Sequence, residues 1–267
     1  LKNKATLAQS PQFYKQILVG IYERVFTVGN AFRAEEHATT RHLNEFTSLD
    51  LEFGMIKDHH DVMNLESDML RYILDHLDKT VSAELKLWNY VRPEIPEKVP
   101  YFKLREAQQI IKEETGVDHT NEPDLEPGEE RFMGEYAKKK FDSDFIFITH
   151  YPTSKRPMYT YPDETDPEFT KSFDLLFRGI EITSGGQRFH DYNELVESMK
   201  RKELNPDDFK FYLEAFKYGM PPEGGFGLGL ERLTARLLEI DNVKYATLFP
   251  RDMNRIDLQI SPPEYKQ

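Results

Sequence analysis

The segment from Phe32 to Glu52 reads FRAEEHATTRHLNEFTSLDLE, and the patterns on either side of its charged middle decide the expected fold. Residues 24–33 and 45–56 alternate apolar and polar side chains, which is the period of a half-buried strand. Residues 34–44 between them are rich in charge. We therefore expect an antiparallel hairpin whose two strands are joined by a long charged loop.

The returning strand presents two faces of different chemistry. One face is largely apolar and is expected to join the core: Thr47, Leu49, Leu51 and Phe53. The other face carries an aromatic ring, a hydroxyl and two carboxylates: Phe46, Ser48, Asp50 and Glu52. Such a face is either the floor of a site where a purine stacks on Phe46 or a solvent face with one stray ring.

Hydrophobic periodicity and capping residues predict the elements outside this hairpin. The expected helices cover residues 10–20, 61–80, 104–115, 128–140, 191–202, 206–218 and 230–239. The expected strands cover residues 145–150, 158–161, 172–183 and 224–229. Helices around mostly antiparallel strands indicate an α+β fold, an antiparallel β-sheet flanked by helices, in one domain over residues 1–267 with a helical insertion at 85–142.

Composition excludes several classes of protein. The 267 residues contain no cysteine, which excludes disulfides, thiolate catalysis and cysteine zinc sites and is compatible with a reducing cytosol. No apolar run approaches the ~18 residues of a membrane span. The net charge of −12 argues against non-specific binding of nucleic acid, although it is compatible with a locally positive site.

Charged residues at the end of the first strand are candidates for nucleotide binding. Arg33 suits a phosphate, because a guanidinium offers two parallel hydrogen bonds. Glu35 lies two residues further on and can accept a hydrogen bond from an exocyclic amine. A surface ion pair is the alternative, and these residues taken alone favour it.

The run from Gly224 to Arg232, GGFGLGLER, is a second candidate for phosphate binding. Its glycines allow a close backbone approach, and the N-terminus of the helix that follows favours anions. Arg232 adds a full positive charge in the first turn. A strand packed tightly against its neighbour would also explain the glycines, and the run has neither Walker nor dinucleotide-binding spacing.

Two carboxylates, Asp174 and Glu181, could hold magnesium beside triphosphate oxygens. Their separation of seven residues puts them on opposite faces of a regular strand, so a bulge near Gly179 would be needed to bring them together. Further along, Arg188 follows the segment SGGQ and suits a small carboxylate ligand.

The segment QSPQFYK opens the first expected helix. Gln12 and Lys15 are three residues apart and share a helix face, while Ser10 caps the same end. An amide, an ammonium and a helix N-terminus suit a zwitterion or a dicarboxylate. An ordinary capped surface helix is the alternative, and the segment alone favours it.

These motifs together resemble the catalytic domain of class II aminoacyl-tRNA synthetases. FRAEEHATTRHLNEFTSLDLE is similar to motif 2 of that family and GGFGLGLER to motif 3, in the same order and at a similar separation. QSPQFYK resembles the aspartate-recognition segment of aspartyl-tRNA synthetases. SGGQR, YP followed by RPMYT, and the closing FPRD agree with the archaeal and eukaryotic type of that enzyme.

The resemblance implies a role for each candidate residue. For ATP, it implies that Arg33 binds the α-phosphate, Glu35 reads the adenine amino group, Phe46 stacks on the base and Arg232 clamps the γ-phosphate. It also implies that Arg41 and His42 contact the outer phosphates or the tRNA acceptor end. Asp174 and Glu181 match the magnesium carboxylates of the family, and Glu181 thereby joins the ATP site. Arg33 and Arg232 would be the catalytic residues.

For aspartate, the resemblance implies that Ser10, Gln12 and Asp50 hold the backbone end, while Lys15 and Arg188 grip the side-chain carboxylate. The implied reaction needs no protein nucleophile: the aspartate carboxylate attacks the α-phosphorus of ATP, and the adenylate is then transferred to tRNA(Asp) in the cytoplasm. Motif 1 and the anticodon-binding β-barrel of the family are expected before residue 1, so we expect an N-terminally truncated chain from a homodimeric protein.

Three alternatives share this fold. Asparaginyl-tRNA synthetase shares the ATP site, but its counterpart of QSPQFYK usually differs, so Lys15 counts against it. A tRNA-independent asparagine synthetase would fit the expected lack of an anticodon domain, but the closer match is to aspartyl enzymes. An inactive synthetase-like regulator is disfavoured by the intact ATP-site residues.

Overall fold

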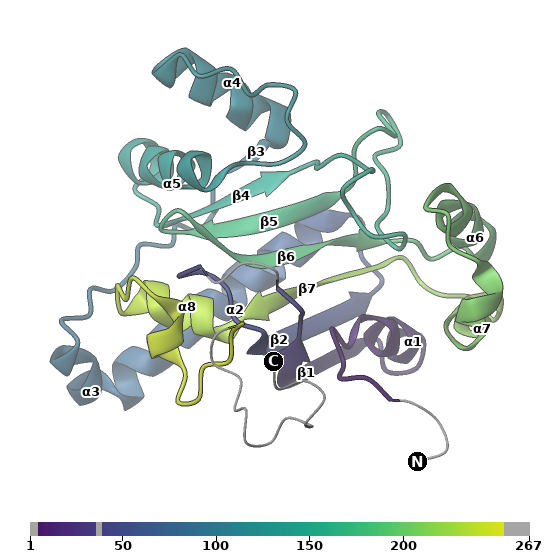
Figure 1. The fold of residues 1–267 in the computed structure, drawn as a ribbon, viewed down its shortest axis with the longest axis horizontal. Coiled ribbons are helices and arrows are strands. Elements are labelled where there is room, and N and C mark those ends of the chain that lie inside the picture. Colours follow the sequence, from purple (N-terminus) through teal and green to yellow (C-terminus); the bar gives the residue numbers. More distant parts are fainter. Residues whose placement is uncertain (1–4, 36–38, 254–267) are drawn as a thin grey trace, which may run out of the picture.

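The computed structural model describes residues 5–35 and 39–253, and a seven-stranded mixed sheet organises them (Figure 1). The strands lie in the order β1-β2-β7-β6-β5-β4-β3. Their bounds are Arg24–Phe32 (β1), Glu45–Gly54 (β2), Tyr101–Lys103 (β3), Phe145–Thr149 (β4), Ser172–Phe177 (β5), Ile180–Arg188 (β6) and Glu223–Gly229 (β7). Neighbours pair antiparallel except β3 and β4, which are parallel.

The expected hairpin of β1 and β2 is confirmed, with Phe32 opposite Glu45 at its loop end. The loop between them includes residues 36–38, which lie outside the described residues. On its other side β2 pairs with the glycine-rich strand β7, where Asp50 lies opposite Gly227. The two motifs that the sequence separates by more than half the chain are therefore adjacent strands.

Eight α-helices and two short 3₁₀ helices surround the sheet in the described part of the chain. The α-helices are Gln12–Tyr22 (α1), His59–Thr80 (α2), Ser82–Leu87 (α3), Leu104–Thr115 (α4), Pro127–Phe141 (α5), Tyr192–Arg201 (α6), Lys210–Lys217 (α7) and Leu230–Leu237 (α8). The 3₁₀ helices are Pro206–Phe209 (η1) and Val243–Ala246 (η2). In Figure 1 the long helix α2 crosses behind the sheet, while α6 and α7 lie beyond one end of its strands.

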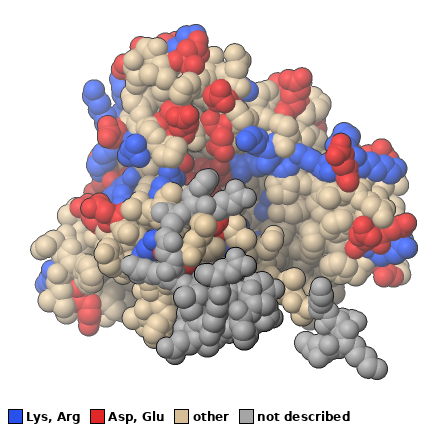
Figure 2. Space-filling view, viewed as in Figure 1, with Lys and Arg blue, Asp and Glu red and all other residues tan. Residues whose placement is uncertain are grey.

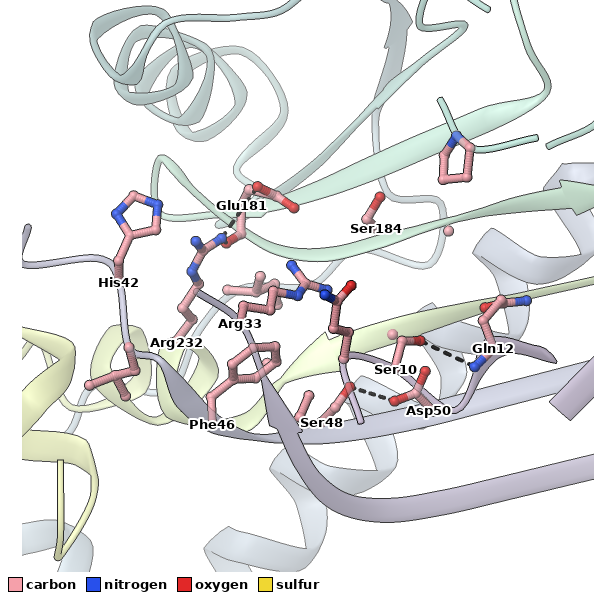
Figure 3. Close-up of a pocket in the computed structure, with 18 of the residues that line it drawn as sticks. Ser10, Gln12, Arg33, His42, Phe46, Ser48, Asp50, Glu181, Ser184 and Arg232 are labelled. Atoms are coloured by element: carbon pink, nitrogen blue, oxygen red, sulfur yellow. Dashed lines mark hydrogen bonds and ion pairs between the residues drawn. The ribbon is translucent and has the colours of Figure 1, made fainter. Parts of the chain in front are cut away.

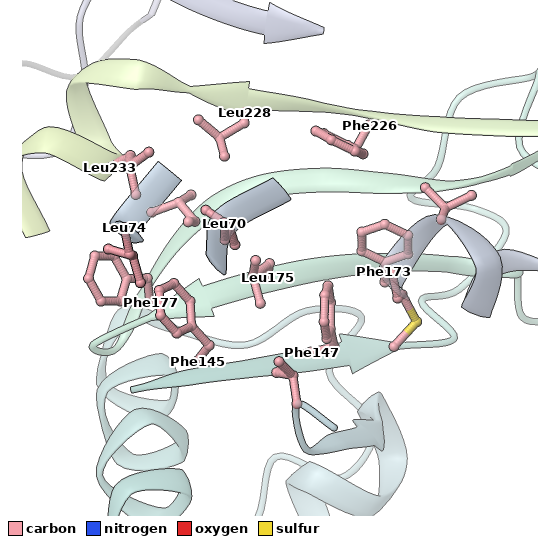
Figure 4. Packing of buried hydrophobic residues seen from close by; sticks show 14 of the residues in the cluster. Leu70, Leu74, Phe145, Phe147, Phe173, Leu175, Phe177, Phe226, Leu228 and Leu233 are labelled. Carbon is pink, nitrogen blue, oxygen red and sulfur yellow. The ribbon is translucent and has the colours of Figure 1, made fainter. Parts of the chain in front are cut away.

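The largest core cluster lies between α2 and the sheet (Figure 4). Leu70 and Leu74 of α2 are 1% and 2% exposed, and they belong to one cluster with Leu175 and with the stacked rings of Phe145 and Phe177. The spacing of four between the two leucines puts both on one face of the helix. This packing covers one face of the sheet, and most of the polar side chains of β2, β6 and β7 lie on the opposite face.

Residues 85–142 contribute the edge strand β3 and the helices α4 and α5. Their apolar side chains form a second cluster in which Leu104 and Met133 are fully buried. This cluster also includes Ile146, Ile148 and Leu176 of the main sheet. The segment is therefore packed onto the sheet rather than held at a distance from it.

The structure corrects two strand predictions. Residues 172–183 are not one strand: Arg178 and Gly179 have φ angles of 45° and 73° and turn the chain between β5 and β6. Positive φ at two successive residues is typical of a tight hairpin turn. Residues 158–161 form no strand and contribute only an isolated bridge between Thr160 and Arg188, because the chain on both sides of them is loop.

The sequence also missed the strand β3, the helix α3 and the direction of one strand. The three-residue strand β3 is too short for its period to show, and its parallel pairing with β4 departs from the expected antiparallel sheet. The six residues of α3, Ser82–Leu87, include no buried side chain, so they carry no amphipathic pattern.

Charge is unevenly distributed over the surface (Figure 2). Lysine and arginine form a band that extends from the central hollow toward the side where α6 lies, and α6 itself ends on Lys200 and Arg201. Among the described residues, no helix combines the length and the apolar character that crossing a membrane requires.

Candidate active site

A cavity of ≈ 470 Å³ opens on the polar face of β2, β6 and β7 (Figure 3). Most of the residues that the sequence proposed for a site line it: Ser10, Gln12, Arg33, Glu35, Arg41, His42, Phe46, Asp50, Glu181, Arg188 and Arg232. Lys15 and Asp174 do not line it and lie just behind its wall, where each is paired with a residue that does. The fold therefore brings the residues predicted to bind ATP and those predicted to bind aspartate together around one cavity.

Arg33 lies over the ring of Phe46, with its guanidinium carbon 5.2 Å from the ring centroid. Figure 3 shows the two side chains stacked at the centre of the cavity. Four other arginines line the cavity, and each is paired with a carboxylate: Arg41, Arg156, Arg188 and Arg232. Within the described residues Arg33 has no such partner, so its charge is available to an anionic ligand.

The described residues 39–44 of the loop between β1 and β2 contact the segment 85–142. A nitrogen of the Arg41 guanidinium lies 2.5 Å from a carboxylate oxygen of Glu130 on α5. Burial raises the pKa of Glu130 to about 7, even though the charge of Arg41 acts in the opposite direction. In the same loop the hydroxyl of Thr39 lies 2.6 Å from Nδ1 of His42. These contacts fix two predicted phosphate-binding residues at one end of the cavity.

Asp174 and Glu181 reach the same region from two strands rather than one. Asp174 on β5 lies opposite Ser184, while Leu176 lies opposite Glu181, and the register shifts between these pairs. Cross-strand pairs share a face of the sheet, and the extra residue of the bulge restores Glu181 to the face of Asp174. A hairpin and a bulge therefore bring the two carboxylates to one face, although they are seven positions apart in the sequence.

The two carboxylates fit a divalent cation. Oδ1 of Asp174 is buried and has no hydrogen-bond partner among the described residues, while Oδ2 accepts from Arg156 at 2.7 Å. Oε2 of Glu181 lies 3.3 Å from the guanidinium of Arg232. Burial and the charge of Asp174 raise the pKa of Glu181. A cation bound between these oxygens would relieve that repulsion.

A buried network of charges closes the other end of the cavity. Nζ of Lys15 lies 2.7 Å from Oδ1 of Asp50 and 3.0 Å from Oε2 of Glu52. Nε of Arg188 donates to the other Glu52 oxygen at 2.7 Å. Burial alone would raise the pKa of Glu52, but the charges of Arg188 and Lys15 outweigh it and lower that pKa. Two cations and two carboxylates therefore balance one another.

The glycines of β7 make room for this network. Lys15 also donates to the carbonyl of Phe226, and Arg188 donates to that of Gly225 at 2.9 Å. A Cβ added at Gly225 would lie 2.4 Å from Oε2 of Glu52. No side chain fits there, so a backbone-only position is what lets Glu52 lie between the two cations.

The start of α1 completes the network. The hydroxyl of Ser10 accepts from the backbone N–H of Gln12 at 3.2 Å, although the residue that immediately precedes the helix is Pro11 rather than Ser10. The amide of Gln12 donates to Glu52 at 3.2 Å. Ser10 and Gln12 both line the cavity, so the start of α1 lies against it, whereas the segment QSPQFYK taken alone favoured an ordinary surface helix.

Sequence reasoning missed several residues of the site. Glu52 was placed on the polar face of its strand but received no role, and it is the centre of the buried network. Arg156 lines the cavity from a loop that shows no periodic pattern. Glu231, next to Arg232, accepts the backbone N–H of Thr47 with both oxygens at 2.9 and 3.0 Å, which ties α8 to β2.

Comparison with known proteins agrees with this geometry. Residues 1–253 match the model of the family described as tRNA synthetases class II (D, K and N). The chain belongs to this family. Its fold is that of a class II synthetase catalytic domain.

Individual relatives of this class II synthetase chain indicate which amino acid its family members use. It is 52% identical over 255 residues to the aspartate–tRNA(Asp/Asn) ligase of Thermus thermophilus, covering 96% of this chain and 60% of that protein. The solved aspartyl-tRNA synthetase of Entamoeba histolytica superposes with a TM-score of 0.86 at 36% identity, covering 93% of this chain and 52% of that one.

An asparaginyl-tRNA synthetase from Pyrococcus horikoshii also superposes with a TM-score of 0.86, but at 31% identity, covering 96% of this chain and 59% of that one. Curated relatives at 41–52% identity are named as aspartate–tRNA ligases. The chain spans about three fifths of the length of the curated relatives it matches.

Proposed function

We propose that this chain carries the active site of an enzyme that activates L-aspartate with ATP and transfers the aspartyl group to tRNA(Asp). One observation carries the proposal: one cavity has at its centre a guanidinium above an aromatic ring, without a carboxylate partner among the described residues, and at one end a buried Arg–Glu–Lys network. The first suits a purine nucleotide, and the second suits a small amino acid with charged groups.

At the nucleotide end, we infer that adenine stacks on Phe46 while Arg33 leaves the ring to bind the α-phosphate. Glu35 reads the adenine amino group, and Arg41 and His42 reach the outer phosphates or the tRNA acceptor end. Arg232 binds the γ-phosphate from the first turn of α8, where the helix dipole adds to its charge. Arg33 and Arg232 act as the catalytic residues, because they stabilise charge that develops on phosphate oxygens.

We assign Asp174 and Glu181 to a magnesium ion that would offset the charge of the triphosphate when bound. Asp174 offers the unpartnered oxygen Oδ1, and Glu181 offers a carboxylate at the cavity surface. Arg156 holds Asp174 at 2.7 Å and keeps it aligned with the cavity wall. The protein's side chains position the substrates and neutralise their charge. The aspartate carboxylate itself attacks the phosphorus, so no protein nucleophile is needed.

At the amino-acid end, we infer that Arg188 binds the side-chain carboxylate of aspartate. Its Nε and Nη2 are bonded within the described residues, which leaves the protons of Nη1 for the ligand. Lys15 already contacts three oxygen atoms, so it reaches the ligand only by giving up one of them. A neutral asparagine amide would leave Arg188 without a matching anion, which disfavours that substrate.

The amino acid's backbone end would be held by Ser10, Gln12 and Asp50. Asp50 accepts hydrogen bonds from Ser48 at 2.5 Å and from Lys15, so its side chain is held in a fixed position in the cavity wall. Such a carboxylate suits the ammonium group of the substrate, and the N-terminus of α1 suits its carboxylate.

We further infer that the full-length protein is a cytoplasmic homodimer. Strand β1 is at the edge of the sheet, and its outer side chains Phe26 and Val28 are 76% and 56% exposed. Ile21 and Tyr22 of α1 are 68% and 66% exposed. An exposed strand edge next to apolar side chains marks an interface, and a second copy would cover it.

Exchange of pyrophosphate into ATP tests the proposed function directly. The full-length protein should catalyse exchange with aspartate and should charge tRNA(Asp) with it. Exchange that depends on asparagine alone would assign the asparaginyl activity instead. Exchange with neither amino acid would leave an inactive synthetase-like protein, and release of free asparagine from aspartate and ammonia without tRNA would identify an asparagine synthetase.

A further inference from the structure

A cluster of three side chains at the start of α2 has no role in the proposed activity. Asp58, His59 and His60 follow one another, and Asp58 caps the helix by accepting the backbone N–H of His60 at 2.7 Å. None of the three lines the active-site cavity. They belong to the helix that crosses behind the sheet in Figure 1.

His59 is the unexplained member of the cluster. Its side chain is 3% exposed, and among the described residues neither of its ring nitrogens has a hydrogen-bond partner. A buried polar atom without a partner costs about 1–3 kcal/mol. Burial, followed by the neighbouring charges of His60 and His150, lowers the pKa of His59 to about 3. The ring is thus a neutral imidazole, and a neutral imidazole has a nitrogen lone pair that can bind a metal ion.

The three side chains place their ligand atoms close together. One ligand atom from each lies within 4.8 Å of the others. Oδ1 of Asp58 and Nδ1 of His60 are 3.2 Å apart, close to the ~3.3 Å between two ligands of a tetrahedral ion with bonds of ~2.0 Å. Partial burial raises the pKa of Asp58, but the hydrogen bond from the backbone of His60 and the neighbouring histidine charges outweigh it and lower that pKa.

The surroundings limit the site to these three residues. The ring of His150 lies 5.3 Å from that of His59, but its Nδ1 contacts Thr149 and its Nε2 contacts Asp163 at 3.0 Å. Both ring nitrogens of His150 therefore already have partners, so His150 packs beside the site and does not serve as a ligand. The side chains of Asp58 and His60 are 41% and 39% exposed, so the remaining side is open to solvent.

We propose that Asp58, His59 and His60 bind a zinc ion at the junction of β2 and α2. Two imidazoles and one carboxylate, with an open fourth position, suit Zn²⁺ better than magnesium, which prefers oxygen ligands alone. The ion would satisfy a ring nitrogen of His59 that otherwise stays unpaired. It would stabilise the folded state by an amount that grows with the logarithm of the free zinc concentration above the Kd, because the unfolded chain does not hold the three ligands together.

Zinc binding to the full-length protein tests the proposal. After treatment with a chelator, the protein is titrated with ZnCl₂ by calorimetry, and Co²⁺ is used as a second probe because a four-coordinate site gives it visible absorption bands. Two variants alter the site gently. Asp58→Asn removes a charge while keeping a good helix cap, and His60→Ala removes a half-exposed ligand.

His76→Ala is the matched control, because His76 is an exposed histidine further along the same helix. We expect wild-type protein and the control to bind zinc equally and to gain thermal stability from it. Asp58→Asn and His60→Ala should each weaken binding by about tenfold or more. The proposal is overturned if the wild type binds no zinc, or if either site variant binds it as tightly as the control. Activity plays no part in this readout.

Discussion

Arg188 and Arg33 are both guanidinium groups in one cavity, but their surroundings give them different tasks. Arg188 is held by Glu52 and by a backbone carbonyl, whereas the Arg33 guanidinium lies over the Phe46 ring and has no carboxylate partner among the described residues. A group held in a fixed direction selects one small ligand. A group without a partner is free to follow a phosphate, so substitutions at the two positions should affect different substrates.

Arg188→Lys keeps the charge but loses the planar fork. We expect kcat/KM for aspartate to fall about 10–100-fold, since a hydrogen bond to a charged group is worth about 1.5–3 kcal/mol. The KM for ATP should stay unchanged. Steady-state pyrophosphate exchange with each substrate varied in turn measures both, and an equal rise in the two KM values would contradict the assignment.

Arg33→Ala removes the guanidinium from the nucleotide end. We expect the exchange rate to fall about 100–1000-fold, the usual effect of losing one preorganised donor to a transition-state oxygen. The melting temperature should be unchanged, because the variant breaks no ion pair within the described residues. Thermal unfolding followed by circular dichroism gives the control, and a large loss of stability would show that Arg33 has a structural role.

Among the elements, the β5–β6 hairpin has a turn that only a glycine can form without strain. Its turn puts Gly179 at a φ of 73°, and a Cβ there would lie 2.7 Å from the Cα of Arg131 on α5. The turn therefore sets the contact between α5 and the sheet, and through the bulge that follows it also sets the direction of Glu181. A residue without a side chain is needed for both reasons.

Gly179→Ala should lower the free energy of unfolding by about 1–3 kcal/mol through backbone strain, with the steric contact adding to it. Gly128→Ala is the matched control on α5, because its added Cβ would have only Arg131 Nη2 nearby, at 3.9 Å. Removing a glycine from a helix should leave the control unchanged or stabilise it by about 0.4–1 kcal/mol. Urea unfolding compares the two variants, and equal effects would contradict the argument.

At the scale of the whole molecule, the buried carboxyl of Glu66 is one of the groups that make stability depend on pH. Glu66 on α2 is fully buried, and neither of its oxygens has a hydrogen-bond partner among the described residues. Burial raises its pKa from 4.5 to about 8. The folded protein therefore keeps a proton that the unfolded chain releases above pH 4.5, and the stability this provides is lost as the pH rises toward 8.

Glu66→Gln removes this titration with little change of shape. We expect wild-type stability to fall by on the order of 4 kcal/mol between about pH 4.5 and 8 through this group, relative to the variant. The variant should consequently be the more stable protein at pH 8. Urea unfolding at a series of pH values measures the difference, and parallel curves for the two proteins would show that Glu66 does not titrate as described.

The sequence by itself determined the hairpin of β1 and β2, its two faces, and the position of the glycine run before α8. These features are local: alternation with period two assigns side chains to faces, and glycine marks a close approach wherever it occurs. Eleven of the proposed site residues accordingly line the cavity. Their individual roles and the description of residues 85–142 as an insertion remain predictions.

Only the tertiary structure decided how the charges pair. Arg188 and Glu52 are 136 residues apart in the chain, and Arg41 and Glu130 are 89 apart. Asp174 and Glu181 share a face because a turn and a bulge intervene, which period-two reasoning on a single strand does not foresee. Such contacts arise where distant strands and loops meet, and no local pattern encodes which partner a buried charge will find. The sequence therefore shows which charged residues are present, whereas the tertiary structure shows which of them are paired.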